Sequence, residues 1–192
     1  MITTAAQISV EPGFGTLELF PLVPTETILY HLFTDLFHDH RNHFIFGPCV
    51  PITMLDLKEP DYPPEISLSN GYLTVDFGAW HFHLCIGEHK GTQHKPLAPE
   101  LLRQRRTARA EFYRRITPNG GIDTWGLRCF NGKGGHQITI LLPTPFVASD
   151  MERLEVPDWS RLALWDDLRF RYLGLTPDPR DRSVRGYRAL AL

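Results

Sequence analysis

Residues 72–86, YLTVDFGAWHFHLCI, have the pattern of a β-hairpin with two unlike faces. Side chains in a strand alternate between faces, so the apolar residues of both arms fall on one side. These residues are Leu73, Val75, Phe77, Trp80, Phe82, Leu84 and Ile86. Gly78 and Ala79 suit a two-residue type II′ turn, in which glycine supplies the positive φ of the first central position. That turn would pair Val75 with Phe82 and place the apolar sets opposite each other.

The other face of this hairpin gathers polar side chains. The same register pairs Asp76 with His81 and Thr74 with His83, with Cβ atoms roughly 4.5 to 5.5 Å apart. Cys85 shares this face. Imidazoles and carboxylates bind Zn, Fe, Ni, Cu or Mn, so we expect a divalent metal ion held by His81, His83 and Asp76. The alternative is that both histidines line the polar side of a half-buried sheet and bond to neighbours such as Thr74.

The segment after the hairpin, GEHKGTQH, adds further titratable groups. We expect Glu88 and His89 to fold back on the hairpin as catalytic groups that move protons, if an open coordination position lets the metal activate water or dioxygen. His81, His83 and Glu88 resemble the first metal motif of the cupins, an HxH pair followed by Glu. The flanking glycines of that motif are displaced and no second motif follows, so neither the cupin fold nor its chemistry is inferred.

The whole chain has 192 residues, a mass of 22.0 kDa and 42% hydrophobic residues, which suits a single domain over residues 1–192. We expect two short β-like runs over about 1–24, forming an edge hairpin or an irregular arm, and a tail over about 176–192 that lies on the surface or against a dimer partner. A net charge of −2 gives no global attraction to nucleic acid or to an anionic membrane. Three cysteines without CxxC spacing, no apolar leader and no long apolar run predict a cytoplasmic protein. A homo-oligomer stays open.

Eight of the nine histidines fall in the first half of the sequence. A helix is predicted over 26–40, and its polar side carries His31, Asp35 and His38 at i, i+4 and i+7. Polar residues opposite an apolar stripe are typical of any surface helix, so these three are not assigned as ligands by themselves. Two further histidines stand at the end of this helix and could join the hairpin site, His40 and His43.

Residues 96–116, PLAPELLRQRRTARAEFYRRI, predict a second helix that begins near Pro99. It carries six arginines, namely Arg103, Arg105, Arg106, Arg109, Arg114 and Arg115. Guanidinium groups match carboxylates and phosphates, so we expect a small anionic ligand with Arg106 and Arg109 as its contacts. The alternatives are a solvated face, or a docking face for an acidic partner in a noncatalytic accessory protein with structural histidines. Nucleic acid is disfavoured because the basic residues are not interleaved with exposed aromatics.

Other segments complete an α+β prediction. Strands are expected over 50–57 and 65–69, and a second hairpin across the turn NGKGG near 124–142. A third helix should begin after a cap at Asp158 or Ser160 and end at Gly174. We therefore predict an antiparallel sheet of hairpins with about three helices packed mainly on one face.

Four segments together resemble a group of small bacterial proteins of unassigned function. They are WHFHLCIGEHKG from Trp80, RRTARAEFYRR from Arg105, WGLRCFNGKGG from Trp125 and SRLALWDDLRFRYLGL from Ser160. The resemblance implies a bacterial cytoplasmic protein and no particular activity. From the residues alone, the leading hypothesis is a metal-binding protein with a mononuclear His/carboxylate site on the hairpin face, which could be a metal-dependent enzyme. A metal-independent enzyme with Cys85 as nucleophile ranks last because Cys85 lies among apolar residues.

Overall fold

The computed structural model describes residues 5–39, 45–47, 62–89, 91–92, 95–148 and 152–189. Its largest sheet is antiparallel, in the order β1-β2-β9-β10-β11-β3. These strands are β1 (Gln7–Glu11), β2 (Gly15–Leu22), β9 (Thr107–Ile116), β10 (Ile122–Asn131), β11 (His136–Leu141) and β3 (Ile45–Gly47). A second sheet contains β4 (Glu65–Ser69), β5 (Tyr72–Asp76) and β6 (His81–Cys85), and a short pair contains β7 (Gly91–Thr92) and β8 (Lys95–Pro96). The α+β class is confirmed.

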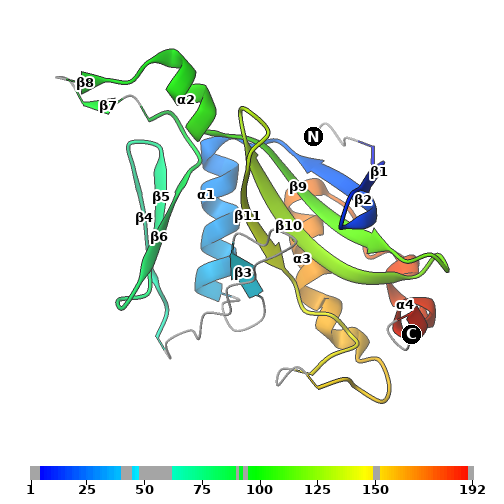
Figure 1. Cartoon of the computed structure of the whole chain (residues 1–192). Helices are drawn as coiled ribbons and strands as arrows, with labels where there is room; N and C mark the ends of the chain where they lie inside the picture. Colours follow the sequence, from blue (N-terminus) through cyan, green and yellow to red (C-terminus); the bar gives the residue numbers. More distant parts are fainter. Residues whose placement is uncertain are drawn as a thin grey trace.

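The helices lie in separate parts of the molecule (Figure 1). Helix α1 (Glu26–Thr34) continues as the π-helix η1 (Asp35–Asp39) and lies between the two larger sheets, while the short α2 (Pro99–Arg105) lies at one end of the molecule. The 3-10 helix η3 (Trp159–Leu162) leads into α3 (Ala163–Leu173), and η4 (Pro179–Arg182) and α4 (Val184–Ala189) follow. Within the described residues, none of these helices has the length and hydropathy to cross a membrane.

The β5–β6 hairpin has the predicted register. Asp76 lies opposite His81 and Thr74 lies opposite His83. Gly78 has a φ of 79°, as a turn at this position requires. The apolar face of the hairpin is buried because η1 covers it: the Phe37 ring centroid lies 6.1 Å from that of Phe77 and 5.4 Å from that of Phe82.

Three helix ends also follow the sequence prediction. Thr25 caps α1, since its Oγ1 accepts the Ile28 N–H at 3.2 Å. Asp158 caps η3 by accepting the Ser160 N–H at 3.1 Å, and Gly174, with a φ of 69°, ends α3. The main core then forms between α1, α3 and one face of the large sheet, where Trp165 packs edge-on against Phe112.

The prediction of one helix over 96–116 is wrong beyond Arg105. Residues Thr107–Ile116 form β9, which pairs with β2 on one side and β10 on the other. Its inward face carries Ala110, Phe112 and Arg114, and all three side chains are buried. An arginine at an inward position hides the period-two alternation, and a run of arginines is equally compatible with a helix.

The opposite face of the sheet holds a smaller buried cluster. Arg128 Nε donates to Glu111 Oε1 at 2.7 Å, and its other nitrogens donate to the Glu11 carboxylate at 2.7 and 2.6 Å. Gly126 lies under the Tyr113 ring, where a Cβ would come within 2.7 Å of a ring carbon. Strand β1 thus folds toward β10 on this side.

Of the two alternatives for the first 24 residues, the structure has the edge hairpin, and the described part of the tail contains two short helices. Residues 7–22 form the β1–β2 hairpin, with β1 at the edge of the sheet. The tail beyond residue 176 forms η4 and α4, and the side chain of Asp181 is 0% exposed. The predicted strand over 50–57 and the histidines at 40, 43 and 94 lie outside the described residues.

Candidate functional site

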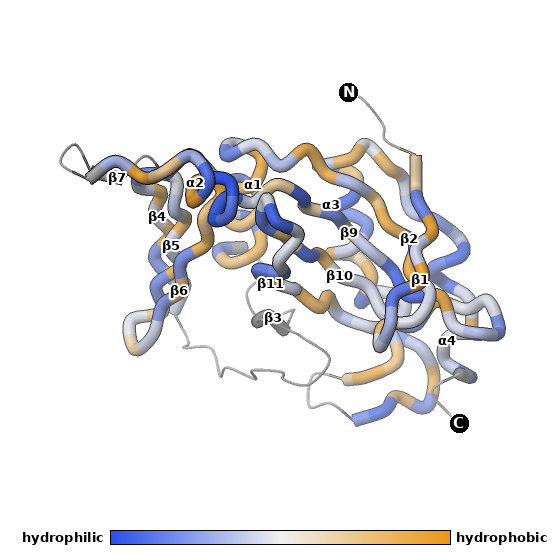
Figure 2. Tube along the Cα trace, turned by 45° about the horizontal axis from the view of Figure 1, so that its top comes forward, coloured by the Kyte–Doolittle hydropathy of each residue, from blue (hydrophilic) through white to orange (hydrophobic). Residues whose placement is uncertain are grey.

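A pocket of about 410 Å³ opens where the hairpin, α2 and the β10–β11 turn meet. Its lining residues are Tyr72, His83, Leu84, Cys85, Leu101, Gln104, Arg105, Asn131 and Gln137. Figure 2 shows α2 next to the β4–β6 sheet, and residues of both line the pocket. The sequence placed His83 and Cys85 on one hairpin face, and both line this pocket.

Contacts between α2 and the β10–β11 turn fix one side of the pocket. Gly132 N donates to Arg103 O at 3.1 Å, and Lys133 Nζ lies 2.9 Å from Glu100 Oε1. A Cβ on Gly132 would lie 2.2 Å from the Arg103 oxygen, so the turn approaches this closely only with glycine there. The turn NGKGG therefore has a docking role in addition to joining two strands.

Thr107 and Gln137 tie three elements together at the base of the pocket. Thr107 Oγ1 lies 3.0 Å from Cys85 O and 2.9 Å from Gln137 Oε1, and its hydroxyl proton can be donated to either. Gln137 Nε2 donates to Arg105 O at 2.9 Å. The last residue of β6, the last residue of α2 and the start of β9 are thereby held at fixed positions.

His81 and His83 lie side by side on the hairpin, as predicted. Their ring centroids are 4.9 Å apart, the rings are inclined at 65°, and both side chains are exposed. His83 Nδ1 lies 2.7 Å from Thr74 Oγ1, which fixes the ring orientation. The other ring nitrogen of His83 is then available to a ligand.

Asp76 has a structural contact that the sequence did not predict. Its Oδ1 accepts the Gly78 N–H at 2.7 Å, so the carboxylate caps the hairpin turn. Within the described part of the chain, no group of three or more His, Cys, Asp or Glu side chains is arranged to hold a metal ion. A metal ion on His81, His83 and Asp76 therefore stays a prediction.

Cys85 is buried. Burial raises the pKa of its thiol, and a hydrogen bond with Tyr72 opposes this to a smaller extent. Its Sγ lies 3.6 Å from Gly87 O. Because the thiolate is the nucleophilic form, a raised pKa argues against Cys85 as a nucleophile at neutral pH.

Glu88 and His89 lie just past the end of β6 and do not line the pocket. Glu88 Oε1 is 3.8 Å from Arg106 Nη1, and His89 Nδ1 is 3.1 Å from Asn70 O. The His89 ring stands edge-on to Tyr72, with centroids 4.9 Å apart. Through Tyr72, His89 contacts the pocket wall, so the structure brings it to the outside of the site.

The predicted anion contacts Arg106 and Arg109 lie on different elements. Arg106 follows α2 directly and faces Glu88, whereas Arg109 is in β9. The Arg109 guanidinium lies 3.8 Å from the centroid of the Phe130 ring, and its Nε is 3.7 Å from Glu111 Oε2. The structure does not bring this pair to one ligand.

A family model matches residues 6–174, a range that contains every residue lining the pocket. The chain belongs to DUF7676, a family of unknown function. The predicted membership in a family of unassigned function is thus confirmed. No curated protein and no solved structure matches.

In this DUF7676 protein, Arg105 is the one arginine or lysine among the described residues that line the pocket. It is the last residue of α2, its side chain is exposed, and no ion pair joins it to another described residue. Sequence reasoning did not distinguish it from the other arginines because their number suggested one continuous helix. Gln104 and Gln137 were also missed, and no local signal marks them, because their positions depend on contacts between distant segments.

Proposed function

We propose that the pocket binds a small anionic ligand, with Arg105 supplying the positive charge. The observation that carries this proposal is the composition of the lining, which among the described residues includes a guanidinium and no carboxylate. A planar guanidinium recognises a carboxylate or phosphate through two parallel N–H donors. The volume of about 410 Å³ falls in the range of roughly 300–1,000 Å³ that is usual for small-molecule sites.

Other lining side chains offer hydrogen-bond donors to the same ligand. Asn131 Oδ1 accepts two backbone N–H groups of the following turn, at 3.0 and 2.8 Å, which leaves its amide nitrogen to donate. His83 is oriented by Thr74 and keeps one ring nitrogen for the pocket. Gln104 is exposed and precedes Arg105 on α2. This set favours an oxyanion over a cation.

Acidic residues beside the pocket have basic partners of their own. Arg103 and Lys133 lower the pKa of Glu100 to about 2, so this carboxylate stays ionised and paired. Glu88 faces Arg106 at 3.8 Å. Neither carboxylate therefore opposes an anion in the pocket.

The test compares two arginines on the same short helix. Inorganic phosphate and acetate are titrated into the wild type, Arg105→Ala and Arg103→Ala, and binding is followed by NMR shifts of the backbone amides of residues 83–85 and 101–106. We expect Arg105→Ala to weaken binding by about tenfold or more, because a charge-assisted hydrogen bond contributes about 1.5 to 3 kcal/mol. Arg103→Ala removes a side chain that is 71% exposed and leaves Glu100 paired with Lys133, so binding should weaken far less than in Arg105→Ala.

Either of two results would contradict the proposal. The first is the absence of any saturable shift at the pocket with both anions. The second is an equal loss of affinity in the two variants, which would indicate attraction by general positive charge.

A second candidate function is divalent metal binding at His81 and His83, supported by the 4.9 Å separation of their rings on an exposed face. Neutral imidazoles at this spacing can bind one Zn²⁺, with water or the anionic ligand in the other positions. The metal content of untagged protein after dialysis against Zn²⁺ tests this. His81→Ala and His83→Ala should each lose the metal, whereas His31→Ala on α1, also exposed, should keep it. A wild-type protein without bound metal would contradict metal binding at His81 and His83.

A further inference from the structure

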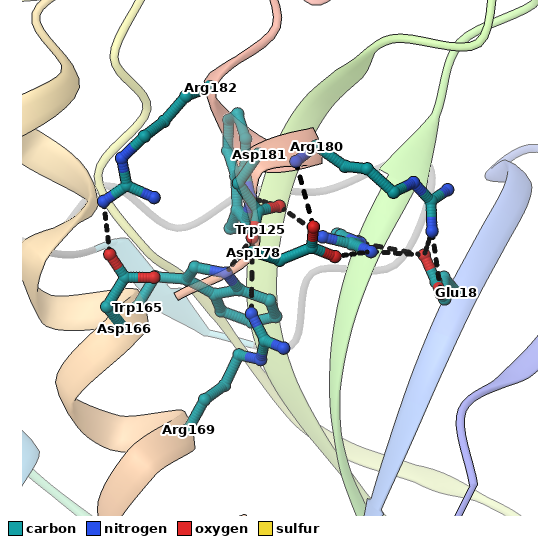
Figure 3. Close-up of polar contacts among 10 residues, drawn as sticks. Glu18, Trp125, Trp165, Asp166, Arg169, Asp178, Arg180, Asp181 and Arg182 are labelled. Atoms are coloured by element: carbon teal, nitrogen blue, oxygen red, sulfur yellow. Dashed lines mark hydrogen bonds and ion pairs between the residues drawn. The ribbon is translucent and has the colours of Figure 1, made fainter. Parts of the chain in front are cut away.

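A second polar site lies inside the molecule, where the chain beyond α3 crosses the large sheet (Figure 3). Its centre is the carboxylate of Asp181 in η4, which is 0% exposed. An ionised carboxylate in the interior is stable only when it is paired and hydrogen-bonded.

Four N–H groups converge on this carboxylate. Arg114 Nη1 donates to its Oδ1 at 2.7 Å, and Trp125 Nε1 donates to the same oxygen at 2.8 Å. Trp165 Nε1 donates to Oδ2 at 3.0 Å, and Arg169 Nη1 donates to it at 3.3 Å. Donors from β9, β10 and α3 therefore surround one carboxylate of Asp181, two for each oxygen (Figure 3).

The donors carry more positive charge than the residues before position 175 neutralise, and beyond that position Asp178 bonds to Arg114 in addition to Asp181. Arg114 and Arg169 are only 1% and 3% exposed. Glu18 is the one carboxylate before residue 175, among the described residues, that bonds to either of them. Burial lowers the pKa of Arg169, and Asp181 opposes this. Its Nε also lacks a hydrogen-bond partner within the described part of the chain.

Donors and acceptor come from different parts of the chain. Arg114, Trp125, Trp165 and Arg169 lie within residues 6–174 that match the family model, and Asp181 lies beyond that range. We propose that the four donors form a carboxylate-binding site, separate from the pocket at Arg105, and that the chain occupies this site itself through Asp181. The ligand class is a single carboxylate whose two oxygens each accept two N–H groups.

A purely structural role for Asp181 would produce the same contacts. The two explanations differ in whether a free carboxylate can enter when the side chain is shortened. Asp181→Ala leaves a methyl group and a space that a formate ion matches in size and charge. The space keeps two guanidinium and two indole N–H donors from the residues around it.

The experiment measures the thermal midpoint of full-length Asp181→Ala in sodium formate and in sodium chloride at equal ionic strength. Formate should raise the midpoint in proportion to the logarithm of its concentration once above its dissociation constant, by about 3 to 6 °C at ten times that constant, and chloride should not. The matched control is Leu168→Ala, which empties a 0% exposed position on the same helix as Arg169 without exposing donors. Formate and chloride should act equally on this control.

An equal effect of the two salts on Asp181→Ala would overturn the proposal. Asp181 would then have only a structural role, holding the C-terminal segment against the sheet. An equal formate effect on Leu168→Ala would overturn it too. If Asp181→Ala does not fold in chloride, its refolding is followed by near-ultraviolet circular dichroism in both salts. Recovery in formate alone supports the site, and failure in both contradicts it.

Discussion

Arg105 and Arg114 come from one arginine-rich stretch and have opposite surroundings. Arg114 is 1% exposed and bonds to three carboxylates, those of Glu18, Asp178 and Asp181. Burial disfavours its charged form, but the carboxylates outweigh this and raise its pKa. Arg105 is exposed beside a pocket in whose described lining there is no acidic residue. The comparison teaches that a buried arginine is committed to the fold, whereas an exposed one without an ion pair to any described residue is available to a ligand.

The largest expected effect separates these two arginines by stability. Arg114→Met should lower the free energy of unfolding by about 3 to 5 kcal/mol, because it leaves carboxylates buried without their cation. Arg105→Met should change it by less than about 0.5 kcal/mol, since it alters an exposed position. Urea denaturation followed by tryptophan fluorescence measures both. Similar losses of unfolding free energy in the two variants would contradict the distinction between a structural Arg114 and an available Arg105.

A smaller effect tests the neutral donors around Asp181. Trp165→Phe keeps most of the ring and removes the Nε1 donor, so we expect a loss of about 1 to 3 kcal/mol in the same denaturation experiment. Trp159→Phe is the control, because Trp159 packs edge-on against Phe146 and is only partly buried. Its loss should be the smaller of the two. The reverse order would show that ring packing matters more than the indole hydrogen bond.

On the pocket side, a glycine comparison tests how tightly the hairpin is closed. Gly71 O accepts N–H groups from Ile86 and Gly87 at 2.9 Å, and a Cβ on Gly71 would lie 2.7 Å from the Glu88 backbone. Gly15 has a similar φ of 82° but nothing within 4 Å of such a Cβ. Gly71→Ala should therefore cost about 1 kcal/mol more than Gly15→Ala in free energy of unfolding. Equal losses would mean that the loop adjusts freely.

The smallest expected effect is a pH dependence of stability that arises from Asp178, which bonds to the buried Arg114. Burial acts to raise the pKa of Asp178, but the Arg180 N–H and Arg114 together lower it. A carboxyl with a lowered folded-state pKa stabilises fully above its ordinary value near pH 4, and this contribution is lost as pH falls through the lowered pKa. Urea midpoints at about pH 6 and pH 3 should therefore differ less in Asp178→Asn than in the wild type. Arg105→Ala should keep the wild-type difference, and an unchanged difference in Asp178→Asn would contradict the assignment.

The parts of the fold that the sequence predicted are those set by local pattern. The register of β5 and β6 followed from unbroken alternation and a glycine at the turn. Strand β9 did not follow, because Arg114 replaces an apolar residue at an inward position. A signal was present in Ala110, Phe112 and Ile116, which alternate before the turn residues at 118–121.

The candidate site was predicted in the same uneven way. His83 and Cys85 could be placed because one strand carries both. Arg105 and Gln137 could not, since they meet only when α2 packs against the β10–β11 turn. Asp181 was hidden by its neighbours: a tail rich in proline and arginine has the composition of a surface arm, and nothing in it marks one aspartate for the interior.

The bonds of Arg114 also impose an order on biosynthesis. Arg114 bonds to Glu18, 96 positions earlier, and to Asp181, 67 positions later. A ribosome releases β2 and β9 while Asp181 is still untranslated, so the nascent sheet holds a guanidinium without its main counter-ion. Arg114 can pair with Asp181 only after the segment that contains Asp181 has been synthesised. Until then the core residues of the growing chain stay accessible to chaperones and proteases.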